Sequence, residues 1–318
     1  MLVREFTEGQ QVAQPLLVRE AERRTRRGGG EYLRLSLGDR SGTLAAMVWD
    51  DVDSICELAR CGTVVHVEGR FERHQRYGPQ LALAQLRVAS PGEYRLEELL
   101  DQPARGPDLM EDDLRELIAT IQQPHLRALL DRTLGRDSSS WGRFREQPAA
   151  KHYHQAYRHG LLEHALSVAQ GVSAISATFP GIDRDVAVTG ALLHDIGKLE
   201  AYEFAGSAIE LTDAGRLQGE IPLGYYRVRQ AIEQIDGFPT ALAEAVCHII
   251  LAHHGSLEHG SPVLPCTREA TLVHMIDNLG GRLGSFDRLE KELRNGERWS
   301  SFDRALGGGA FFAGREAA

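Results

Sequence analysis

Residues able to bind divalent metals interrupt four apolar stretches in the second half of the chain. They are His164, His194-Asp195, His253-His254 and Asp277. A polar side chain in an apolar helical stretch costs free energy unless it has a partner, so four such positions together indicate a shared role rather than four separate core histidines. Neutral imidazoles and carboxylates bind borderline and hard divalent cations. The pattern predicts a metal site suited to manganese, iron, zinc or magnesium.

The adjacent pair His194 and Asp195 suggests how such a site would work. On a helix the two side chains are about 100° apart, so both can reach one metal, and Asp195 could bridge two ions. Water bound to the metal loses a proton near neutral pH and can attack phosphorus. Lys198 follows one turn later and could bind a phosphate oxygen or the leaving group; the alternative is a solvated lysine at a helix end. We interpret Asp195 and Lys198 as catalytic residues of a phosphodiester hydrolase.

The elements that carry these residues are predicted to be helices. From about residue 110 the apolar residues follow a helical period, as at Leu114, Leu117 and Ile118, with few strand signals up to about 295. We therefore predict an all-α domain over 110–300 and a C-terminal tail over 301–318. A stretch rich in Pro and Gly predicts a linker over 93–109.

The first 92 residues show the alternation of β-strands instead. Five strands are predicted, with a short helix over 50–60 between the third and the fourth; the strands cover about 12–21, 31–37, 43–49, 64–72 and 80–88. This order is that of an OB-fold, a small barrel that often binds oligonucleotides. The alternative is a barrel that only packs against its neighbour. The fold class is thus a small β-barrel followed by an all-α domain.

The charge of the chain supports a nucleic-acid partner for the barrel half. The net charge is −9, but residues 1–90 hold 13 arginines and 12 carboxylates, a balance of +1, which leaves −10 for the remainder. Arginine can pair with phosphates and stack on bases, and aromatic rings can stack on bases as well. The candidate substrate-binding residues of this half are Arg23, Arg24, Arg26, Arg27, Tyr32, Arg73, Arg76 and Tyr77. Trp49 and Phe71 could be stacking platforms or core residues.

Length and composition indicate the number of domains and the cellular location of the protein. At 318 residues, with 42% hydrophobic and 25% charged residues, the chain has the length of about two globular domains. The four cysteines show no C-x-x-C spacing, so no zinc ribbon or disulfide framework is predicted. The N-terminus lacks the basic and apolar regions of a signal peptide, and no apolar run approaches the length of a membrane span. We expect a cytoplasmic protein without a membrane partner, and apolar helix surface is compatible with a homo-oligomer.

The metal-binding motifs resemble those of the HD superfamily of metal-dependent phosphohydrolases. The longer phrases resemble the YhaM-type 3′→5′ exoribonucleases, which join an OB-fold to an HD domain in this order; they include Gly160-Leu-Leu-Glu-His164, Leu193-His-Asp-Ile-Gly-Lys198, Leu251-Ala-His-His-Gly255 and Ile276-Asp-Asn-Leu279. The resemblance covers nearly the whole chain. It implies one or two divalent ions, with manganese as the preferred metal. It also implies release of 5′-mononucleotides from the 3′ end of single-stranded RNA, with single-stranded DNA as a further candidate substrate.

One position departs from the family pattern. Where the family tends to have Gly-His, this chain reads Gly219-Glu220. A carboxylate is a competent ligand for manganese or magnesium, so Glu220 joins the candidate ligands; otherwise the second metal would be weakened. His154 takes the place of a family histidine and could contact the substrate phosphate, or it could be a surface histidine.

Two other functions remain open on the sequence. The same metal chemistry could act on a free nucleotide or a cyclic nucleotide, with the barrel as a regulatory module, because a metal reads phosphate and not sugar or base. Alternatively, Glu220 could mark a weakened site in a nucleic-acid-binding protein. A groove for several nucleotides would favour the nuclease.

Overall fold

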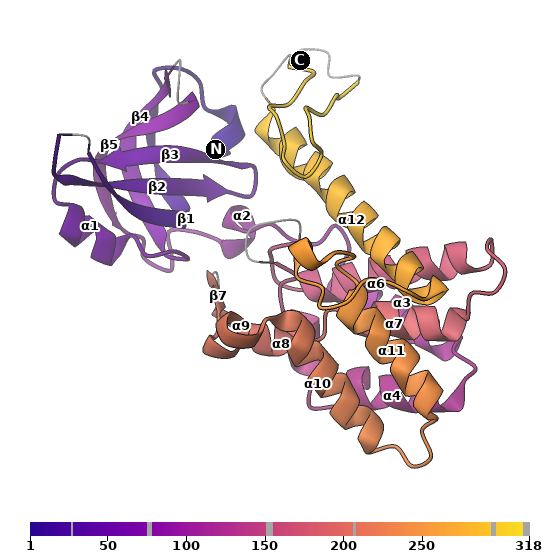
Figure 1. Ribbon diagram of the computed structural model, residues 1–318. Coiled ribbons are helices and arrows are strands. Elements are labelled where there is room, and N and C mark those ends of the chain that lie inside the picture. The colour runs from indigo at the N-terminus through magenta and orange to yellow at the C-terminus, as the bar shows by residue number, and fades with distance from the viewer. Residues whose placement is uncertain (27, 75–77, 151–154, 206–207, 294–296, 314–318) are drawn as a thin grey trace. The chain divides into compact units, whose positions relative to one another are not determined.

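The computed structural model describes residues 1–26, 28–74, 78–150, 155–205, 208–293 and 297–313 (Figure 1). The chain divides into two compact units. The first comprises Met1–Asp101, Ala205–Ala208 and Phe286–Ala318, and the second comprises Gln102–Phe204 and Ile209–Ser285. Within the described residues, no helix has both the length and the apolar character needed to cross a membrane.

The N-terminal unit is built on a closed five-stranded barrel. Its strands are β1 (Gln11–Thr25), β2 (Glu31–Asp39), β3 (Gly42–Val48), β4 (Val64–His74) and β5 (Gly78–Val88). They follow the order β1-β2-β3-β5-β4 around the barrel; β3 and β5 are parallel and the other neighbours are antiparallel. Helix α1 (Val52–Leu58) lies between β3 and β4 in the chain. The predicted OB-like barrel is confirmed.

The barrel core follows from the alternation in the sequence. Leu33, Leu35 and Leu37 of β2 are fully buried, whereas the residues between them are partly exposed. Because successive side chains of a strand point to opposite faces, this pattern directs every second residue inward. The N-terminal 3₁₀ turn η1 (Val3–Glu5) is fastened to the barrel by the buried carboxylate of Asp39, whose Oδ2 accepts a hydrogen bond from the Val3 backbone N–H at 2.7 Å.

The second unit is helical, as predicted, with one addition. Its main helices are α3 (Pro107–Ala119), α4 (Pro124–Leu134), α5 (Trp141–Glu146), α6 (Gly160–Ser176), α7 (Arg184–Leu193), α8 (Lys198–Ala201), α9 (Asp213–Gln218), α10 (Glu220–Glu233), α11 (Thr240–Ala252) and most of α12 (Arg268–Glu292), which continues into the first unit from Phe286. Between α8 and α9, strands β6 (Tyr202–Ala205) and β7 (Ala208–Leu211) form a two-stranded sheet. The 3₁₀ turn η2 (Leu257–His259) also belongs to this unit, whereas the short helix α2 (Leu96–Leu99) belongs to the first.

Helices α6, α7 and α11 form the centre of the helical core. Almost every residue of α7 is buried, including Val188, Leu192 and Leu193. A close approach joins α7 to α11, because a Cβ added to Gly190 would lie 2.3 Å from Cδ1 of Ile249. The glycine therefore sets the distance between the two helices, and the candidate ligands His194 and His253 directly follow these helices in the chain.

We expect Gly190→Ala to destabilise the protein. Alanine normally stabilises a helix interior relative to glycine by about 0.5–1 kcal/mol, but a methyl group at this contact would force the core apart and cost about 1–3 kcal/mol. Gly280→Ala on α12 is the matched control, since an added Cβ there meets nothing within 4 Å. Urea denaturation should show a loss for the first variant and a small gain for the second. Equal effects would contradict the close approach.

Candidate metal centre

Two histidines of the site are held by the ends of α7 and α11. His194 and His253 each occupy the C-cap position, with helical backbone angles. The Nδ1 atom of each ring lies 2.7 Å from the carbonyl oxygen of the residue three positions earlier. These carbonyls belong to the last helical turn and lack an intrahelical partner. Because a carbonyl only accepts, Nδ1 is assigned the proton, and the lone pair of Nε2 is left for the centre of the site.

Three further residues meet these histidines. His164 lies near the N-terminal end of α6, Asp195 follows α7, and Asp277 comes from α12. The His164 Nε2 atom lies 3.1 Å from Oδ1 of Asp277, 3.3 Å from Oδ2 of Asp195 and 3.2 Å from Nε2 of His194. All five side chains are buried except for the partly exposed Asp277. The structure thus brings together five of the seven predicted ligands in one cluster.

Asp195 lies between the two parts of the cluster. Its Oδ2 faces His164 and His194, the latter at 3.4 Å, while its Oδ1 lies 3.6 Å from Nε2 of His253. The expectation that His194 and Asp195 share one continuous helix is wrong, because α7 ends at Leu193 and residues 194–197 form a turn. The turn is possible because Gly197 has no side chain: a Cβ there would lie 2.0 Å from the backbone oxygen of Glu220.

The cluster has the properties of a cation site. Within the described part of the chain, the buried atoms Oδ1 of Asp195 and Nε2 of His253 have no hydrogen-bond partner. With Nδ1 of His194 protonated, its Nε2 presents a lone pair to Nε2 of His164, 3.2 Å away. Buried polar atoms without partners are costly, and a cation would satisfy them together. Two sets of three ligands lie close enough to hold one: His164, His194 and Asp277, and His194, Asp195 and His253.

The electrostatics of the cluster favour positive charge. Burial alone would raise the pKa of Asp195, but the charges of Lys198 and His194 and the hydrogen bonds of His194 and His253 together hold that pKa well below its usual value. Burial alone would lower the pKa of His194, yet the charges of Asp195 and Asp277 raise it. The carboxylates therefore stay ionised and draw positive charge toward the imidazoles. A divalent cation would supply that charge at the same place.

Glu220 and His254 lie beside the main cluster and not within it. The His254 Nε2 atom is 3.8 Å from Oε1 of Glu220, and the ring of His254 lies 4.4 Å from that of His253 between centroids. The His254 Nδ1 atom is fixed by the carbonyl oxygen of His259 at 2.8 Å. Glu220 is the first residue of α10. The pair therefore extends the row of candidate ligands beyond His253.

Lys198 is the predicted catalytic cation, and it is not a solvated surface lysine. Its side chain is 12% exposed, and its Nζ donates a hydrogen bond to Oδ2 of Asp195 at 2.6 Å. Burial would lower the pKa of Lys198, but the charge and hydrogen bond of Asp195, together with the charges of Asp277 and Glu220, outweigh burial and raise that pKa. The ammonium group is therefore charged and lies at the edge of the ligand cluster.

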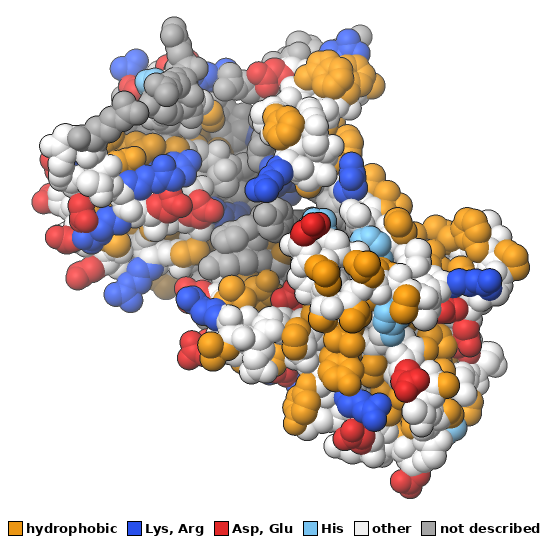
Figure 2. Space-filling model, viewed as in Figure 1, with side chains coloured by type: hydrophobic (Ala, Val, Ile, Leu, Met, Phe, Trp, Pro, Cys, Tyr) orange, Lys and Arg blue, Asp and Glu red, His pale blue; other side chains and the backbone are white. Residues whose placement is uncertain are grey.

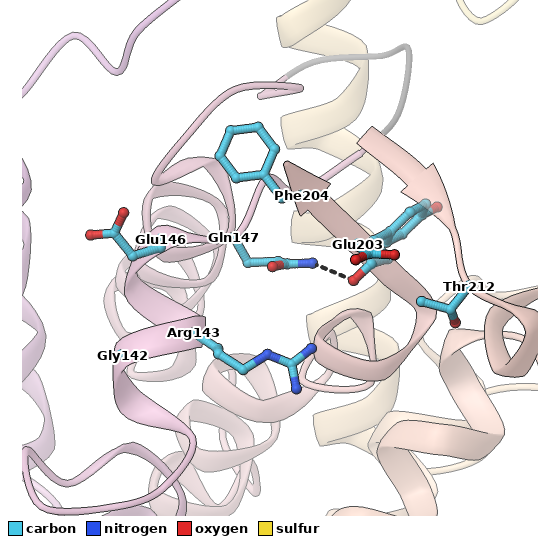
Figure 3. Close-up of a pocket in the computed structure, with 8 residues that line it drawn as sticks. Gly142, Arg143, Glu146, Gln147, Glu203, Phe204 and Thr212 are labelled. Atoms are coloured by element: carbon cyan, nitrogen blue, oxygen red, sulfur yellow. Dashed lines mark hydrogen bonds between the residues drawn. The ribbon is translucent and has the colours of Figure 1, made fainter. Parts of the chain in front are cut away.

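A cavity adjoins the segment that follows Lys198 (Figure 3). It has a volume of about 450 Å³ and is lined by residues of α5, β6 and the start of α9, including Arg143, Gln147 and Phe204. Its polar groups are largely engaged: the Gln147 side-chain amide donates to the Tyr202 carbonyl oxygen at 2.9 Å and to the Lys198 carbonyl oxygen at 3.3 Å. The lining therefore holds the backbone of α8 and of the residue that follows it.

The candidate substrate-binding residues of the barrel lie in the other unit, and several arginines are paired with carboxylates. Arg23 contacts Glu31 at 2.9 Å and Asp53 at 2.7 Å, and Arg24 pairs with Glu22. Figure 2 shows basic and acidic side chains intermixed over the barrel in this view. Exposed pairs of this kind are weak and can exchange for phosphate. Arg73 is exposed at the end of β4. Four candidates lie outside the described residues: Arg27, Arg76, Tyr77 and His154.

Trp49 and Phe71, whose positions the sequence left open, differ in burial. Trp49 is 50% exposed, so it is not a core residue, whereas Phe71 is buried in the barrel core. The ring of Trp49 stacks on that of Tyr32 with centroids 4.9 Å apart, and the guanidinium of Arg26 lies 4.9 Å from the Trp49 ring centroid. Gln155, which was not among the predicted site residues, has its side-chain oxygen 3.1 Å from Nδ1 of His164. No motif in the sequence marks that residue.

Comparison with known proteins places the chain among metal-dependent hydrolases. The HD domain model matches residues 161–281. The chain is 30% identical over 293 residues to the 3′-5′ exoribonuclease YhaM of Bacillus subtilis (strain 168), covering 91% of this chain and 90% of that protein. It is 29% identical over 300 residues to the protein of the same name from Shouchella clausii (strain KSM-K16), covering 93% and 91%.

Part of the chain also matches a solved structure. It is Entamoeba histolytica asparaginyl-tRNA synthetase in complex with asparaginyl-adenylate, which matches with a TM-score of 0.23 and 14% identity over 40% of this chain and 34% of that chain.

We expect Mn²⁺ to stabilise the chelator-treated protein against unfolding. A ligand that binds only the folded state at about 100 times its Kd adds about 2.7 kcal/mol. Asp277→Asn should abolish most of this gain, because it removes a charged ligand from the cluster. Asp287→Asn, at an exposed position on the same helix α12, should leave the gain intact. Thermal unfolding with and without Mn²⁺ measures both, and an equal gain in the two variants would count against the site.

Proposed function

The chain belongs to the family of the 3′-5′ exoribonuclease YhaM, and from this premise we propose that it shortens single-stranded RNA from the 3′ end by metal-dependent hydrolysis. The observation that carries the proposal is the position of Asp195, whose two carboxylate oxygens face different ligands. Such a carboxylate is suited to bridge two cations. The barrel in the same chain supports a polymeric substrate, because a hydrolase of free nucleotides needs no separate groove for a strand.

The ligands divide into two sets around Asp195. His164, His194 and Asp277 would hold one cation together with Oδ2 of Asp195. A second cation would use Oδ1 of Asp195 with three further residues, His253, His254 and Glu220. We propose manganese as the metal, because the set combines imidazoles with three carboxylates and contains no thiolate. When bound, the metals would supply Lewis-acid charge at the phosphoryl oxygens and a water of lowered pKa.

Lys198 supplies a fixed positive charge beside the reacting phosphate in this proposal. An ammonium group has three N–H donors, and one is directed to Asp195 at 2.6 Å. The others can bind a phosphate oxygen or the leaving oxygen, where negative charge develops during hydrolysis. Its pairing with Asp195 also holds the ammonium in place before the substrate arrives. We therefore assign substrate binding and charge stabilisation to Lys198.

The stack of Arg26, Trp49 and Tyr32 is the best-formed candidate for RNA binding on the barrel. Its half-exposed indole offers a flat surface on which an unpaired base can stack, and the neighbouring guanidinium can contact the phosphate backbone. Stacking tolerates any base, because every base has a π-face, and this suits an enzyme that degrades a strand step by step. Base stacking and phosphate contacts are common to RNA and single-stranded DNA, so this surface would bind both. The nuclease assay below compares the two substrates.

We expect His194→Ala and Asp195→Ala to abolish turnover while RNA binding is retained. The test follows 5′-labelled single-stranded RNA, and a DNA of the same sequence, with Mn²⁺ or with chelator. The wild type should give a Mn²⁺-dependent ladder that shortens from the 3′ end. His248→Ala is the control, since His248 lies on α11 but accepts a hydrogen bond from the Cys266 backbone instead of facing the cluster. An intact oligonucleotide beside hydrolysed free nucleotides would assign the site to a nucleotide phosphohydrolase.

We expect Trp49→Ala to weaken RNA binding at every salt concentration by about 1–3 kcal/mol, the usual contribution of one stacked base. Arg26→Gln should instead reduce the slope of log K against log salt by about one, because one phosphate contact is lost. Trp299→Ala is the matched control: it removes another exposed tryptophan of the same unit, which pairs with Phe311. Fluorescence anisotropy with labelled RNA measures all three. Equal losses for the two tryptophans would argue against a local platform.

A further inference from the structure

The four histidines of the proposed metal centre, three in the main cluster and His254 beside it, are oriented in two different ways. Each has its Nδ1 atom beside a hydrogen-bonding oxygen, which fixes the ring. For three of them the oxygen is a backbone carbonyl: Ala191 for His194, Ile250 for His253 and His259 for His254. For His164 the oxygen belongs to the side chain of Gln155, 3.1 Å away. A backbone carbonyl can only accept, whereas a side-chain amide can present either an acceptor or a donor.

Gln155 is held in place by unusual backbone geometry. Its φ is +58°, a left-handed conformation that is uncommon for residues other than glycine. Its carbonyl oxygen accepts a hydrogen bond from the Ala149 backbone N–H at 3.1 Å. A Cβ added to Gly160, the first residue of α6, would lie 2.0 Å from that same oxygen. The absence of a side chain at Gly160 therefore lets the Gln155 backbone approach the helix that carries His164.

We propose that Gln155 is a positioning residue that sets the tautomer of His164 and thereby tunes the affinity of the centre for its metal. The inference rests on the proposed function, because it concerns the same metal site. When the amide oxygen faces Nδ1, the ring keeps its proton there and its Nε2 lone pair is available to a cation. When the amide nitrogen faces Nδ1, the proton lies on Nε2 and points toward Oδ1 of Asp277, 3.1 Å away.

The second arrangement satisfies the hydrogen bonds of the metal-free site but blocks metal binding by His164. An amide that rotates by 180° can hydrogen-bond to either tautomer of the ring. Gln155 therefore allows Nε2 of His164 to carry a proton when no metal is bound and to bind a metal when one is present. A glutamate at this position can only accept when ionised, so it favours the metal-binding tautomer and makes the ring a stronger ligand. A leucine of similar size favours neither state. Partners of this kind typically change metal affinity by about 10–100-fold.

The experiment is calorimetric titration of chelator-treated protein with Mn²⁺, without RNA. We expect Gln155→Leu to weaken binding by about 10–100-fold and Gln155→Glu to bind at least as tightly as the wild type. Gln170→Leu makes the same chemical change at an exposed position of α6 and should have no effect. Gln155→Asn provides a second variant that tolerates the left-handed backbone better than leucine but is too short to reach His164; it should also bind weakly.

The outcomes separate this inference from the metal site itself. If the wild type binds Mn²⁺ and Gln155→Leu and Gln155→Asn bind it equally well, Gln155 has no positioning role and the inference is overturned. If Gln155→Glu is as weak as Gln155→Leu, the residue acts only by packing, which also overturns it. If the wild type takes up no Mn²⁺, the proposed metal centre fails and this inference fails with it.

Discussion

The burial of one carboxylate among imidazoles and a lysine is the constraint on which the rest of the helical unit depends. Asp195 is 3% exposed and cannot remain ionised in that position without positive partners. Its partners come from α6, α8 and the end of α11, together with His194 beside it, so these helices must converge on a single point of the chain. The tight contacts at Gly190 and Gly197 are consequences of that convergence, since both let backbone or side chains approach the α7 segment more closely than a Cβ would allow.

Much of this arrangement could be predicted from the sequence, because the signals were local and repeated. The alternation around Leu33, Leu35 and Leu37 predicts a half-buried strand, and the barrel contains it. The lone polar residues within apolar stretches predict a shared site, and the structure places His164, His194 and Asp277 within reach of one cation. In each case the residue type is costly unless it has a particular environment. Apolar residues that alternate along a strand need a buried face, and polar residues within apolar helices need a polar partner or a metal.

Other features depend on contacts between distant parts of the chain and leave no local signal. The turn at residues 194–197 follows from the approach of α10 to Gly197, which no periodicity of α7 reveals. Gln155 lies nine positions before His164 in an irregular segment, so its side-chain contact could not be read from spacing. Trp49 is equally compatible with a core or an exposed position by residue type, and only its place at the end of β3 beside Tyr32 decides. The short strands β6 and β7, four residues each, are too brief to produce a recognisable alternation.

The C-cap positions of His194 and His253 place the C-terminal ends of α7 and α11 next to the cluster. The peptide dipoles of α7 and α11 add along each helix to the equivalent of about half a negative charge at the C-terminal end. Both ends are directed at the cluster by the ligands that cap them. The protein therefore attracts a cation through its backbone as well as its side chains, and this backbone contribution cannot be titrated away. Glu220 lies at the opposite, positive end of α10, where a carboxylate is better suited than a second cationic group. Helix polarity thus gives a reason for an acidic residue at that end of the site.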